Sequence, residues 1–495
     1  MPIGYNGPQS EIVSDNWPSS NLFHTEVSDF VTTHLQQGNI GGPLQPPYPP
    51  NYRSSPLGAF KRRTSGKVRV IHDLSWPPSH SVNDFISSKE FTLTYTTVDR
   101  AADLTTHYKE PWLVKIDLQS AFLSCPVRKK DQHLLGFSWP DSTGSLRRMY
   151  FKVLPFGLRS SPAQFNVLAS ALLYIMVARG TSYTLLNYLD DFIALCSSQD
   201  EAQHTLNLML DTCHRAGFKV QPSKTLGPAR SLEFLGIEID TVNQQLRITQ
   251  ERMEEIRELL GDWLSKQVCT KRDLLSLIGK LSFCARVVRA GKMFIRRLIE
   301  LSKKARNLHH RLTLTHQVKA DLRWWARSIK SHNGITWLDN VWDSSTQHVL
   351  YTDASNIAIG AIFGNAWSYL EFVKDNVWLC NTPIVYKEMY AVVFSLAVFG
   401  RQMSGKHVKM YTDNAAVYHC INQGTSKDPK IMGLLRSLYH YTVLYGIYYK
   451  AYWLSTVENA ASDSVSRLQF DRFRQLHPQA DLHPTPPTVV LTDFD

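Results

Sequence analysis

Residues 188–192, which read YLDDF, constrain the fold of this chain more than any other stretch. Short apolar runs lie on both sides of it, at 184–186 and 192–195. The pattern predicts two strands joined by a tight polar connection that carries Asp190 and Asp191. Aspartate is common in turns that bind nothing, but adjacent carboxylates repel each other unless they share a cation. The pair alone therefore suits either a plain turn or a divalent-metal site.

A third aspartate favours the metal site. Residues 112–116 are mostly apolar and predict a strand, and Asp117 closes it, so its side chain would project from the sheet edge toward the same cation. Between the aspartates lies LPFGLRSSPAQF, residues 154–165, which predicts a Pro/Gly bend and then a helix. By themselves these features predict a mixed α/β domain.

In this order the three pieces, with LxPFGLxxSPxxF and YLDD intact, resemble the palm of a reverse transcriptase. The resemblance implies a multidomain α+β and α/β fold, in which a right-hand polymerase has fingers, palm and thumb. It also implies two Mg²⁺ ions, for which Mn²⁺ is a possible substitute. Asp117, Asp190 and the backbone of Leu118 would hold them, with Asp191 in support.

The same resemblance assigns substrate contacts in and around the palm. Phe122, five residues after Asp117, corresponds to the aromatic side chain that lies under the sugar and excludes a ribose 2′-hydroxyl, although a lone phenylalanine is far more often a core residue. Lys224, in preference to Lys219, would protonate the leaving pyrophosphate. Residues 232–237 resemble the hairpin that grips the primer strand. The bend supplies two further predicted substrate contacts, Phe156 and Gly157.

A basic hairpin is predicted at 61–73, where Thr-Ser-Gly makes the turn and a short strand follows. Arginine and lysine side chains bind phosphate oxygens, so such a hairpin can hold a triphosphate. It resembles the fingers hairpin of reverse transcriptases, which makes Arg62, Lys67 and Arg69 predicted substrate-binding residues. Without the palm downstream, an exposed basic hairpin with no ligand would be the preferred interpretation.

After residue 248, apolar residues recur at steps of three and four, which predicts amphipathic helices. Thr270 and Asp273 have the spacing of a capping box at a helix start. Between 266 and 330, seventeen Lys/Arg stand against three acids, a net charge of +14, whereas the whole chain carries +11. A solvated helical face accounts for any single basic cluster, but the whole segment indicates a bound polyanion. Helices after a palm resemble a thumb that closes over the primer–template duplex.

Residues 346–468 form a second predicted unit, with elements in the order βββαβααβα. Asp353 and Asp413 each close a strand that ends Tyr-Thr-Asp, Glu388 lies near the start of a helix, and Asp463 lies in the last helix. This arrangement resembles ribonuclease H. The resemblance implies that these four acids hold two Mg²⁺ about 3.5–4 Å apart and activate a water that cuts RNA paired to DNA.

A polymerase followed by a ribonuclease H marks a retroelement protein. Several motifs in the second unit are similar to those of DIRS-like, tyrosine-recombinase retrotransposons rather than gypsy-type elements: 413–414, 421–426, 434–436 and 459–467. Two positions depart from that family, since residues 453–456 read WLST in place of His-Ile-x-Gly and Ser462 replaces the usual Ala before Asp463. Neither departure removes a predicted metal-binding acid.

The resemblance implies an RNA template, a DNA primer, RNA–DNA hybrids and dNTPs as partners, together with a capsid-like protein and a recombinase of the element. No membrane segment is expected, because the longest uncharged apolar run, 167–178, is too short to span a bilayer and predicts a buried helix. Seven cysteines without a CxxC pair indicate reduced thiols inside the cell, in cytoplasm and/or nucleus.

Two rival functions remain. One is a decayed or domesticated copy that only binds nucleic acid, and the other is an RNA-dependent RNA polymerase, which would not account for Phe122 or the second unit. The predicted domains are a flexible N-terminal segment (1–50), fingers and palm (51–245), a basic helical thumb (246–310), a connector (311–345), a ribonuclease H-like domain (346–470) and a C-terminal tail (471–495).

Overall fold

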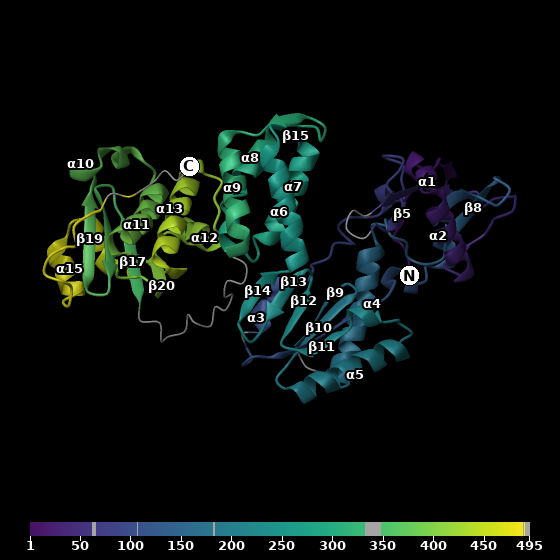
Figure 1. The fold of residues 1–495 in the computed structure, drawn as a ribbon, viewed down its shortest axis with the longest axis horizontal. Coiled ribbons are helices and arrows are strands. Elements are labelled where there is room, and N and C mark those ends of the chain that lie inside the picture. Colours follow the sequence, from purple (N-terminus) through teal and green to yellow (C-terminus); the bar gives the residue numbers. More distant parts are fainter. Residues whose placement is uncertain (62–65, 106, 182–183, 332–347, 489, 491–495) are drawn as a thin grey trace. The chain divides into compact units, whose positions relative to one another are not determined.

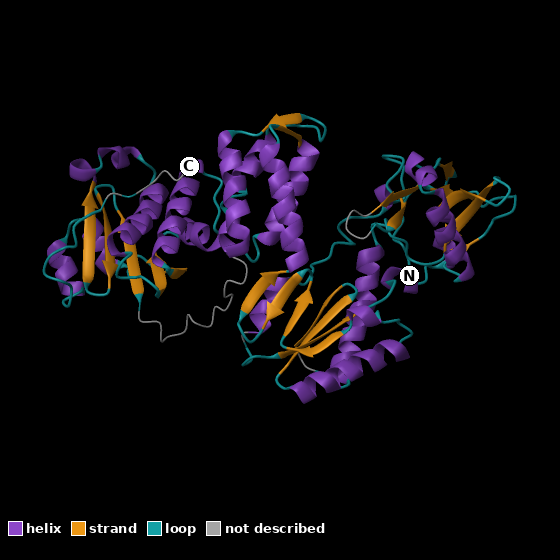
Figure 2. Cartoon of the chain, in the orientation of Figure 1, coloured by secondary structure: helices purple, strands orange, loops and turns teal. Residues whose placement is uncertain are grey.

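The protein is described by a computed structural model that covers residues 1–61, 66–105, 107–181, 184–331, 348–488 and 490. The chain forms two compact units, one of residues 1–235 with 239–242, the other of 236–238 with 243–495. Figures 1 and 2 show the helices and strands of each unit.

The N-terminal segment is folded, so the prediction of a flexible segment at 1–50 is wrong. Its helix α2 (His24–Gln36) buries Val27 and Val31. Its short strands β1 (Ile12–Val13) and β2 (Ile40–Gly41) form the two edges of a five-stranded sheet. The other strands of that sheet are β3 (Arg53–Ser54), β7 (Gly136–Pro140) and β8 (Leu146–Phe151). The polar composition led to the wrong prediction, because a few apolar residues at helical spacing are enough to pack the segment against the rest of the unit.

The predicted fingers hairpin is present as β4 (Leu57–Lys61) paired antiparallel with β5 (Val68–His72). At the end of β5, the His72 side chain is buried, its Nε2 lies 3.0 Å from the Gly136 carbonyl, and its ring stacks on Phe151. Burial lowers the pKa of His72 to about 4. The folded first unit therefore holds this imidazole neutral.

This burial predicts an acid-sensitive first unit. The folded pKa of His72 lies below the ordinary value of 6.5, so its contribution to stability is full above pH 6.5 and is lost as the pH falls toward 4. The loss should reach about 3 kcal/mol at the acid end. Amide exchange of peptides spanning 68–72 and 136–140, corrected for intrinsic rates, measures it. In His72→Gln, which keeps an N–H donor but does not titrate, the acid-induced loss should be much smaller, and an equal loss would contradict the assignment.

The palm is a four-stranded sheet in the order β11-β6-β10-β9. Its strands are β6 (Trp112–Asp117), β9 (Thr184–Tyr188), β10 (Asp191–Cys196) and β11 (Leu226–Ala229). Helices α4 (Ser161–Ala178) and α5 (Gln199–Arg215) pack with it. By length and composition alone α4 could cross a membrane, but it packs on the palm core through Phe165, Ala169, Leu172 and Met176. The prediction of a buried helix holds for this face only, since Val167 and Tyr174 are 62% and 74% exposed.

The thumb contains more of the chain than predicted. Strands β12 (Ser231–Phe234) and β13 (Ile237–Asp240) form the predicted hairpin and, with β14 (Gln245–Ile248), a small sheet. Helices α6 (Gln250–Ser265), α7 (Lys271–Cys284), α8 (Arg296–Lys303) and α9 (His316–Ser331) follow. Thr270 caps α7 as predicted, accepting from the Asp273 N–H over 3.2 Å. Because α9 packs against α6, residues 311–331 belong to this bundle and not to a separate connector; the rest of the predicted connector, up to 345, lies outside the described residues.

The last domain contains the predicted βββαβααβα elements in order, with a short additional helix α10 (Phe372–Asp375) before α11 and α15 after the last predicted helix. Its sheet runs β19-β18-β17-β20-β21. The strands are β17 (Val349–Ala354), β18 (Ala358–Phe363), β19 (Ala366–Glu371), β20 (His407–Thr412) and β21 (Tyr448–Trp453), and the helices include α11 (Ile384–Phe399), α12 (Ala415–Gln423), α13 (Pro429–Tyr445), α14 (Ala460–Ser466) and α15 (Phe470–Leu476). Helices α11 and α13 cover one face of the sheet, and α14 and α15 lie against part of the other (Figure 1).

The domain continues beyond residue 470, so the predicted boundary of a C-terminal tail at 471 is wrong. Phe473 on α15 is fully buried. The Trp367 indole N–H donates to the Asp481 carbonyl over 2.8 Å, and the Ser368 hydroxyl donates to the Thr485 carbonyl over 2.8 Å. These contacts pin the chain to β19 at least as far as residue 485.

Candidate active sites

The palm aspartates meet at one end of the sheet. Strands β6 and β10 pair so that Asp117 lies opposite Asp191. The hairpin between β9 and β10 turns at Leu189, whose φ is 52°, and Asp190. The Leu118 N–H donates to the Asp190 carbonyl over 2.9 Å and ties the hairpin to the end of β6. The geometry thus gathers the three predicted aspartates and the backbone of Leu118.

Two lysines neutralise this end of the sheet. Lys224 Nζ lies 2.7 Å from Asp117 Oδ2, and Lys115 Nζ lies 3.3 Å from Asp191 Oδ1. Burial raises the pKa of Asp190, and raises that of Asp191 to about 6 although Lys115 opposes the rise. Burial and mutual repulsion destabilise the ionised form of these carboxylates. Such a group is suited to bind a divalent cation, which prefers oxygen ligands. A cation on Asp117 would share that carboxylate with Lys224.

Lys115 is a site residue that the sequence interpretation missed. The alternation of a strand places Lys115 and Asp117 on the same face of β6, which was a usable signal. Lys224, by contrast, was predicted, and the structure places its ammonium on the catalytic candidate Asp117. Its role as proton donor to pyrophosphate stays a prediction.

The predicted sugar gate lies in an aromatic cluster. The ring of Phe122 packs on Phe156 and Phe165, with centroids 5.1 and 5.6 Å away. Phe165 is buried core, whereas Phe156 is 56% exposed. Phe122 therefore has core on one side and an exposed ring on the other, a position compatible with contacting a bound nucleotide.

Gly157 is required by the backbone at the bend. Its φ is +99°, and a Cβ there would lie 2.3 Å from the carbonyl oxygen of His72. The bend thus meets the end of the fingers strand β5, which carries Arg69 three residues earlier. Lys67 and Arg69 are both exposed on this hairpin, and Arg62 lies outside the described residues.

In the last domain, three of the four predicted acids converge. Ligand oxygens of Asp353, Glu388 and Asp413 all lie within 4.8 Å of one another, and among the described residues this is the one such acidic group. Glu388 Oε1 accepts from the Ala354 N–H over 3.2 Å, while its buried Oε2 has no hydrogen-bond partner. Burial, reinforced by Asp353, raises the pKa of Glu388 to about 9. An orphaned buried carboxylate oxygen inside an acidic cluster fits a divalent cation.

The fourth acid, Asp463, lies beside this cluster and pairs with two arginines. Arg467 Nε lies 2.7 Å from Asp463 Oδ1, and Arg472 approaches its other oxygen at 3.7 Å.

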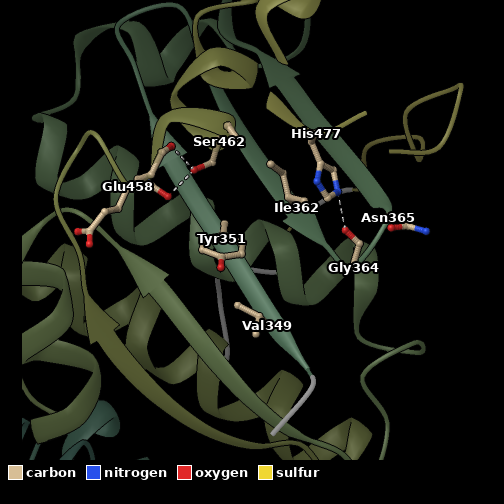
Figure 3. Close-up of a pocket in the computed structure, with 10 residues that line it drawn as sticks. Val349, Tyr351, Ile362, Gly364, Asn365, Glu458, Ser462 and His477 are labelled. Carbon is tan, nitrogen blue, oxygen red and sulfur yellow. Dashed lines mark hydrogen bonds between the residues drawn. The ribbon is translucent and has the colours of Figure 1, made fainter. Parts of the chain in front are cut away.

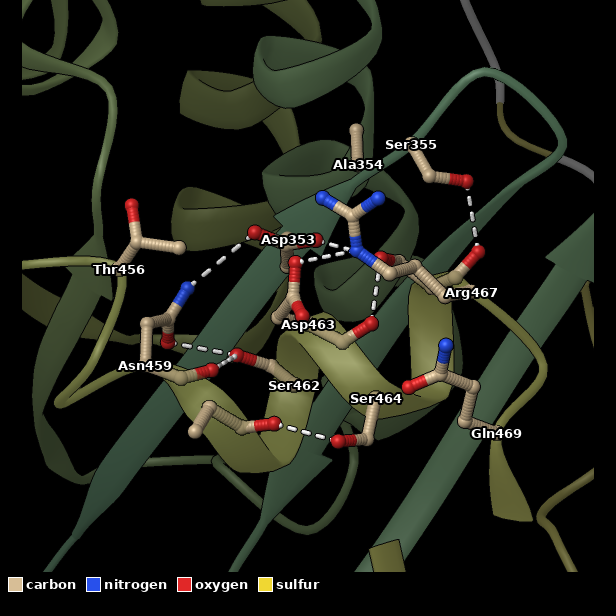
Figure 4. Close-up of polar contacts among 12 residues, drawn as sticks. Asp353, Ala354, Ser355, Thr456, Asn459, Ser462, Asp463, Ser464, Arg467 and Gln469 are labelled. Carbon is tan, nitrogen blue, oxygen red and sulfur yellow. Dashed lines mark hydrogen bonds and ion pairs between the residues drawn. The ribbon is translucent and has the colours of Figure 1, made fainter. Parts of the chain in front are cut away.

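Asp353 accepts from the Ser466 hydroxyl and, over 3.4 Å, from the Asn459 amide (Figure 4). Burial nevertheless raises the pKa of Asp353 to about 7. Ser466 and Asn459 position the acid and were not among the predicted site residues.

The residues that depart from the family pattern form hydrogen bonds with Asp413 or with a neighbour of Asp353. The Trp453 indole N–H donates to the Asp413 carbonyl, and the Thr456 hydroxyl donates to Asp413 Oδ2, each over 2.8 Å. The Ser462 hydroxyl bonds Asn459 Oδ1, and Asn459 in turn contacts Asp353. The unusual residues are therefore integrated into the site.

Some basic residues of the thumb form ion pairs with acids inside the second unit. Arg297 on α8 and Arg436 on α13 both pair with Asp321, at 3.2 Å each, and Asp321 is only 1% exposed. Lys303 pairs with Glu300 at 2.9 Å. Exposed basic residues such as Lys292, Lys304 and Arg306 remain available on this surface to face a polyanion.

Comparison with known proteins assigns both domains. Residues 69–239 match the family described as reverse transcriptase (RNA-dependent DNA polymerase). Residues 343–441 match the RNase H-like domain found in reverse transcriptase. The chain carries a reverse-transcriptase domain followed by a ribonuclease H-like domain. The predicted fold class, a right-hand polymerase with a ribonuclease H-like domain behind it, is thereby confirmed.

Solved structures share this fold. A foamy viral protease-reverse transcriptase in complex with double-stranded DNA aligns with a TM-score of 0.55 at 16% identity, over 91% of this chain and 72% of that one. The same viral enzyme in complex with an RNA/DNA hybrid aligns with a TM-score of 0.55 at 16% identity, over 91% of this chain and 56% of that one.

Curated relatives are polyproteins of retroelements. The Gag-Pol polyprotein of Rous sarcoma virus subgroup B is 24% identical over 242 residues, 48% of this chain and 14% of the polyprotein. The Tf2-3 polyprotein of Schizosaccharomyces pombe is 23% identical over 297 residues, 57% of this chain and 20% of the polyprotein. The matched region thus spans only a small part of these relatives.

Proposed function

We propose that this protein is an RNA-directed DNA polymerase with an attached ribonuclease H, which copies retroelement RNA into DNA. The observation that carries the proposal is the presence of two separate carboxylate sites, one on each of the two matched domains. In the palm, Asp117, Asp190 and the Leu118 carbonyl would hold two Mg²⁺, with Asp191 in support. Bound there, the ions would activate the primer 3′-hydroxyl and neutralise the departing pyrophosphate.

The chain's own palm residues have distinct tasks in this reaction. Lys115 favours the ionised form of Asp191, Phe122 contacts the sugar, and Lys224 lies next to the acids with a proton to give to pyrophosphate. The basic fingers residues Lys67 and Arg69, with Arg62, would bind the triphosphate. Phe156 and Gly157 would border the same nucleotide, since Phe156 packs on Phe122.

In the second domain, Asp353, Glu388, Asp413 and Asp463 would hold two Mg²⁺. The ions would supply an activated water for cleavage of RNA in a hybrid. Ser466, Asn459 and Thr456 orient the acids, because each donates a hydrogen bond to one of them. The substrates would be an RNA template, a DNA primer, their hybrid and dNTPs.

The finer assignment within this proposal is a DIRS-like element that works in cytoplasm and/or nucleus with a capsid-like protein and a recombinase as partners. The motifs at 413–414, 421–426, 434–436 and 459–467 support it. A tyrosine-recombinase reading frame beside this gene would agree with that assignment, whereas an adjacent integrase frame would contradict it.

Purified protein, a primed RNA template, Mg²⁺ and the four dNTPs provide the decisive assay. We expect primer extension and shortening of the labelled RNA, both stopped by EDTA and both restored when Mg²⁺ or Mn²⁺ is added in excess. A protein that binds the primed template but neither extends nor cuts would instead be a decayed or domesticated copy that only binds nucleic acid. The acids at all seven metal-binding positions argue against that rival.

A further inference from the structure

The face of the ribonuclease H-like sheet opposite α11 and α13 carries a row of aromatic and basic residues. We name this the outer Tyr–Lys face: Tyr351, His407, Lys409, Tyr411, Tyr448, Lys450 and Tyr452. Alternate residues of the same strands, such as Leu350, Met410 and Ala451, point into the core under the helices. Helices α14 and α15 cover β18 and β19 on this side, through Ile362 and Trp367, and α14 also contacts β17, where Tyr351 packs against the edge of the same cluster.

The strand register aligns these side chains into rungs. Tyr351 pairs with Tyr411, and Tyr411 with Tyr452, while Lys409 pairs with Lys450. The rings of Tyr351 and Tyr411 are stacked with centroids 5.2 Å apart, and Tyr452 continues the row at 5.5 Å from Tyr411. The ammonium groups of Lys409 and Lys450 lie 6.0 and 5.9 Å from the Tyr452 ring. One end of the aromatic row is therefore positively charged.

The other end of the row opens into a hollow of about 400 Å³ between the sheet and α14. Tyr351, Val349 and Ile362 form an apolar wall, and polar side chains that include Asn365, Ser462 and His477 surround it (Figure 3). An aromatic wall with hydrogen-bonding groups around it is what an unstacked nucleobase requires.

The hollow also adjoins the acids. Asp353 lies two residues after Tyr351 on β17, a step of about 7 Å, and Asp413 lies two residues after Tyr411, directly beyond the end of β20. Asn459 lines the hollow and also donates to Asp353. A strand bound on this face would therefore lead directly to the cleavage site.

Charge selects the class of ligand. Before the strands reach Asp353 and Asp413, their outward positions carry lysine, histidine and tyrosine but no acid. Glu458 is the acid that lines the hollow. Its carboxylate already accepts hydrogen bonds from the Ser455 N–H and hydroxyl, over 2.9 and 2.7 Å. Aromatic rings interleaved with cations bind single-stranded nucleic acid by stacking and phosphate pairing.

We propose that the outer Tyr–Lys face and its hollow bind unpaired RNA that continues from the RNA strand of a hybrid held at the ribonuclease H acids. One base stacks on Tyr351 in the hollow, and phosphates pair with Lys409 and Lys450. This deepens the proposed function and rests on it, because the RNA must enter from that cleavage site.

Binding of the full chain in EDTA, measured by fluorescence anisotropy, tests the proposal with three probes: a blunt RNA–DNA hybrid, the same hybrid with a single-stranded RNA overhang, and the same hybrid with a DNA overhang. The RNA overhang should tighten binding about fivefold or more. Lys450→Glu and Tyr351→Leu should each remove most of this advantage. Arg401→Glu, the same charge change at an exposed position on another part of the domain, should leave it intact.

The position of the RNA is tested with 4-thiouridine in the overhang. Crosslinks on peptides that contain Tyr351, Lys450 or Tyr452 support the proposal. If both variants keep the tighter binding to the RNA overhang and no crosslink forms on these peptides, the proposal is overturned. The outer Tyr–Lys face would then be a surface for a protein partner. An equal advantage from the DNA overhang, lost in the same variants, would overturn the assignment to RNA. Cleavage of the blunt hybrid by the wild type in Mg²⁺ is a separate readout, so failure of the ribonuclease H assignment would be seen independently.

Discussion

Replacement of Asp190 and Asp191 by asparagine should abolish primer extension while RNA in a hybrid is still cut. Neutral amides hold paired divalent cations poorly, and losing about 4 kcal/mol of transition-state stabilisation corresponds to a rate loss of roughly a thousandfold. Cleavage should continue because Asp353, Glu388 and Asp413 form their own cluster on another domain. Extension and cleavage are measured on the same labelled hybrid.

The structure identifies a cleaner variant for this experiment. Lys115 is buried and pairs with Asp191, so Asp191→Asn leaves a buried cation without its counter-ion and also lowers stability. Asp190→Asn alone keeps this pair and should by itself silence extension. Hybrid binding must be intact in each variant, since an unfolded chain would lose both activities.

The reciprocal variant is Asp413→Asn, which should silence hybrid cleavage while extension on a DNA template continues. An asparagine at this position can still accept the hydrogen bond that Thr456 donates to Asp413, so the loop at 453–456 should keep its conformation. Loss of cleavage in the Asp190→Asn protein, folded and bound to hybrid, would refute the assignment of two independent sites.

Phe122→Val should let the polymerase accept ribonucleotides. Shortening the side chain opens space where a ribose 2′-hydroxyl would lie, so discrimination against rNTPs should fall at least tenfold, about 1.4 kcal/mol. Single-nucleotide kinetics with a dNTP and the matching rNTP give the ratio. Valine is preferable to alanine because Phe122 packs on Phe156 and Phe165, and a larger cavity would also destabilise the palm.

Phe165→Leu provides the matched control for the gate. Phe165 touches Phe122 from the buried side, so its truncation disturbs the same cluster without opening the exposed side. We expect lower stability but unchanged selectivity between dNTP and rNTP. Equal selectivity changes in both variants would mean that Phe122 acts only as core.

The sequence predicted the elements that carry strong local signals. The YLDD hairpin, the helix cap at Thr270 and the Tyr-Thr-Asp strand ends all appear where they were expected, since each depends on neighbouring residues. Asp117, Asp353 and Asp413 reach their sites for the same reason: a strand that ends in aspartate delivers it to the end of the sheet. Their assigned catalytic roles stay predictions.

What the sequence missed depends on contacts between distant segments. The N-terminal segment was taken as flexible because its composition is polar, yet β2 pairs with β8, more than a hundred residues away. Asn459 and Ser466 lie in the motif at 459–467, but nothing in that motif marks them as partners of Asp353, because they reach it from more than a hundred residues away. The C-terminal residues looked like a tail, but they cover β19 through Asp481 and Thr485.

The buried Asp321 has a consequence for how such proteins can be recombined in evolution. It lies on α9 of the thumb, and it pairs with Arg436 of the ribonuclease H-like domain as well as with Arg297 of α8. Met293, from the thumb side, belongs to the same apolar core as the ribonuclease H sheet. A gene fusion that exchanged the ribonuclease H-like domain alone would bury Arg436 against a foreign surface without its carboxylate, at a cost of several kcal/mol. The thumb, from β12 onward, and the ribonuclease H-like domain should therefore be inherited together, with the natural point of exchange before β12.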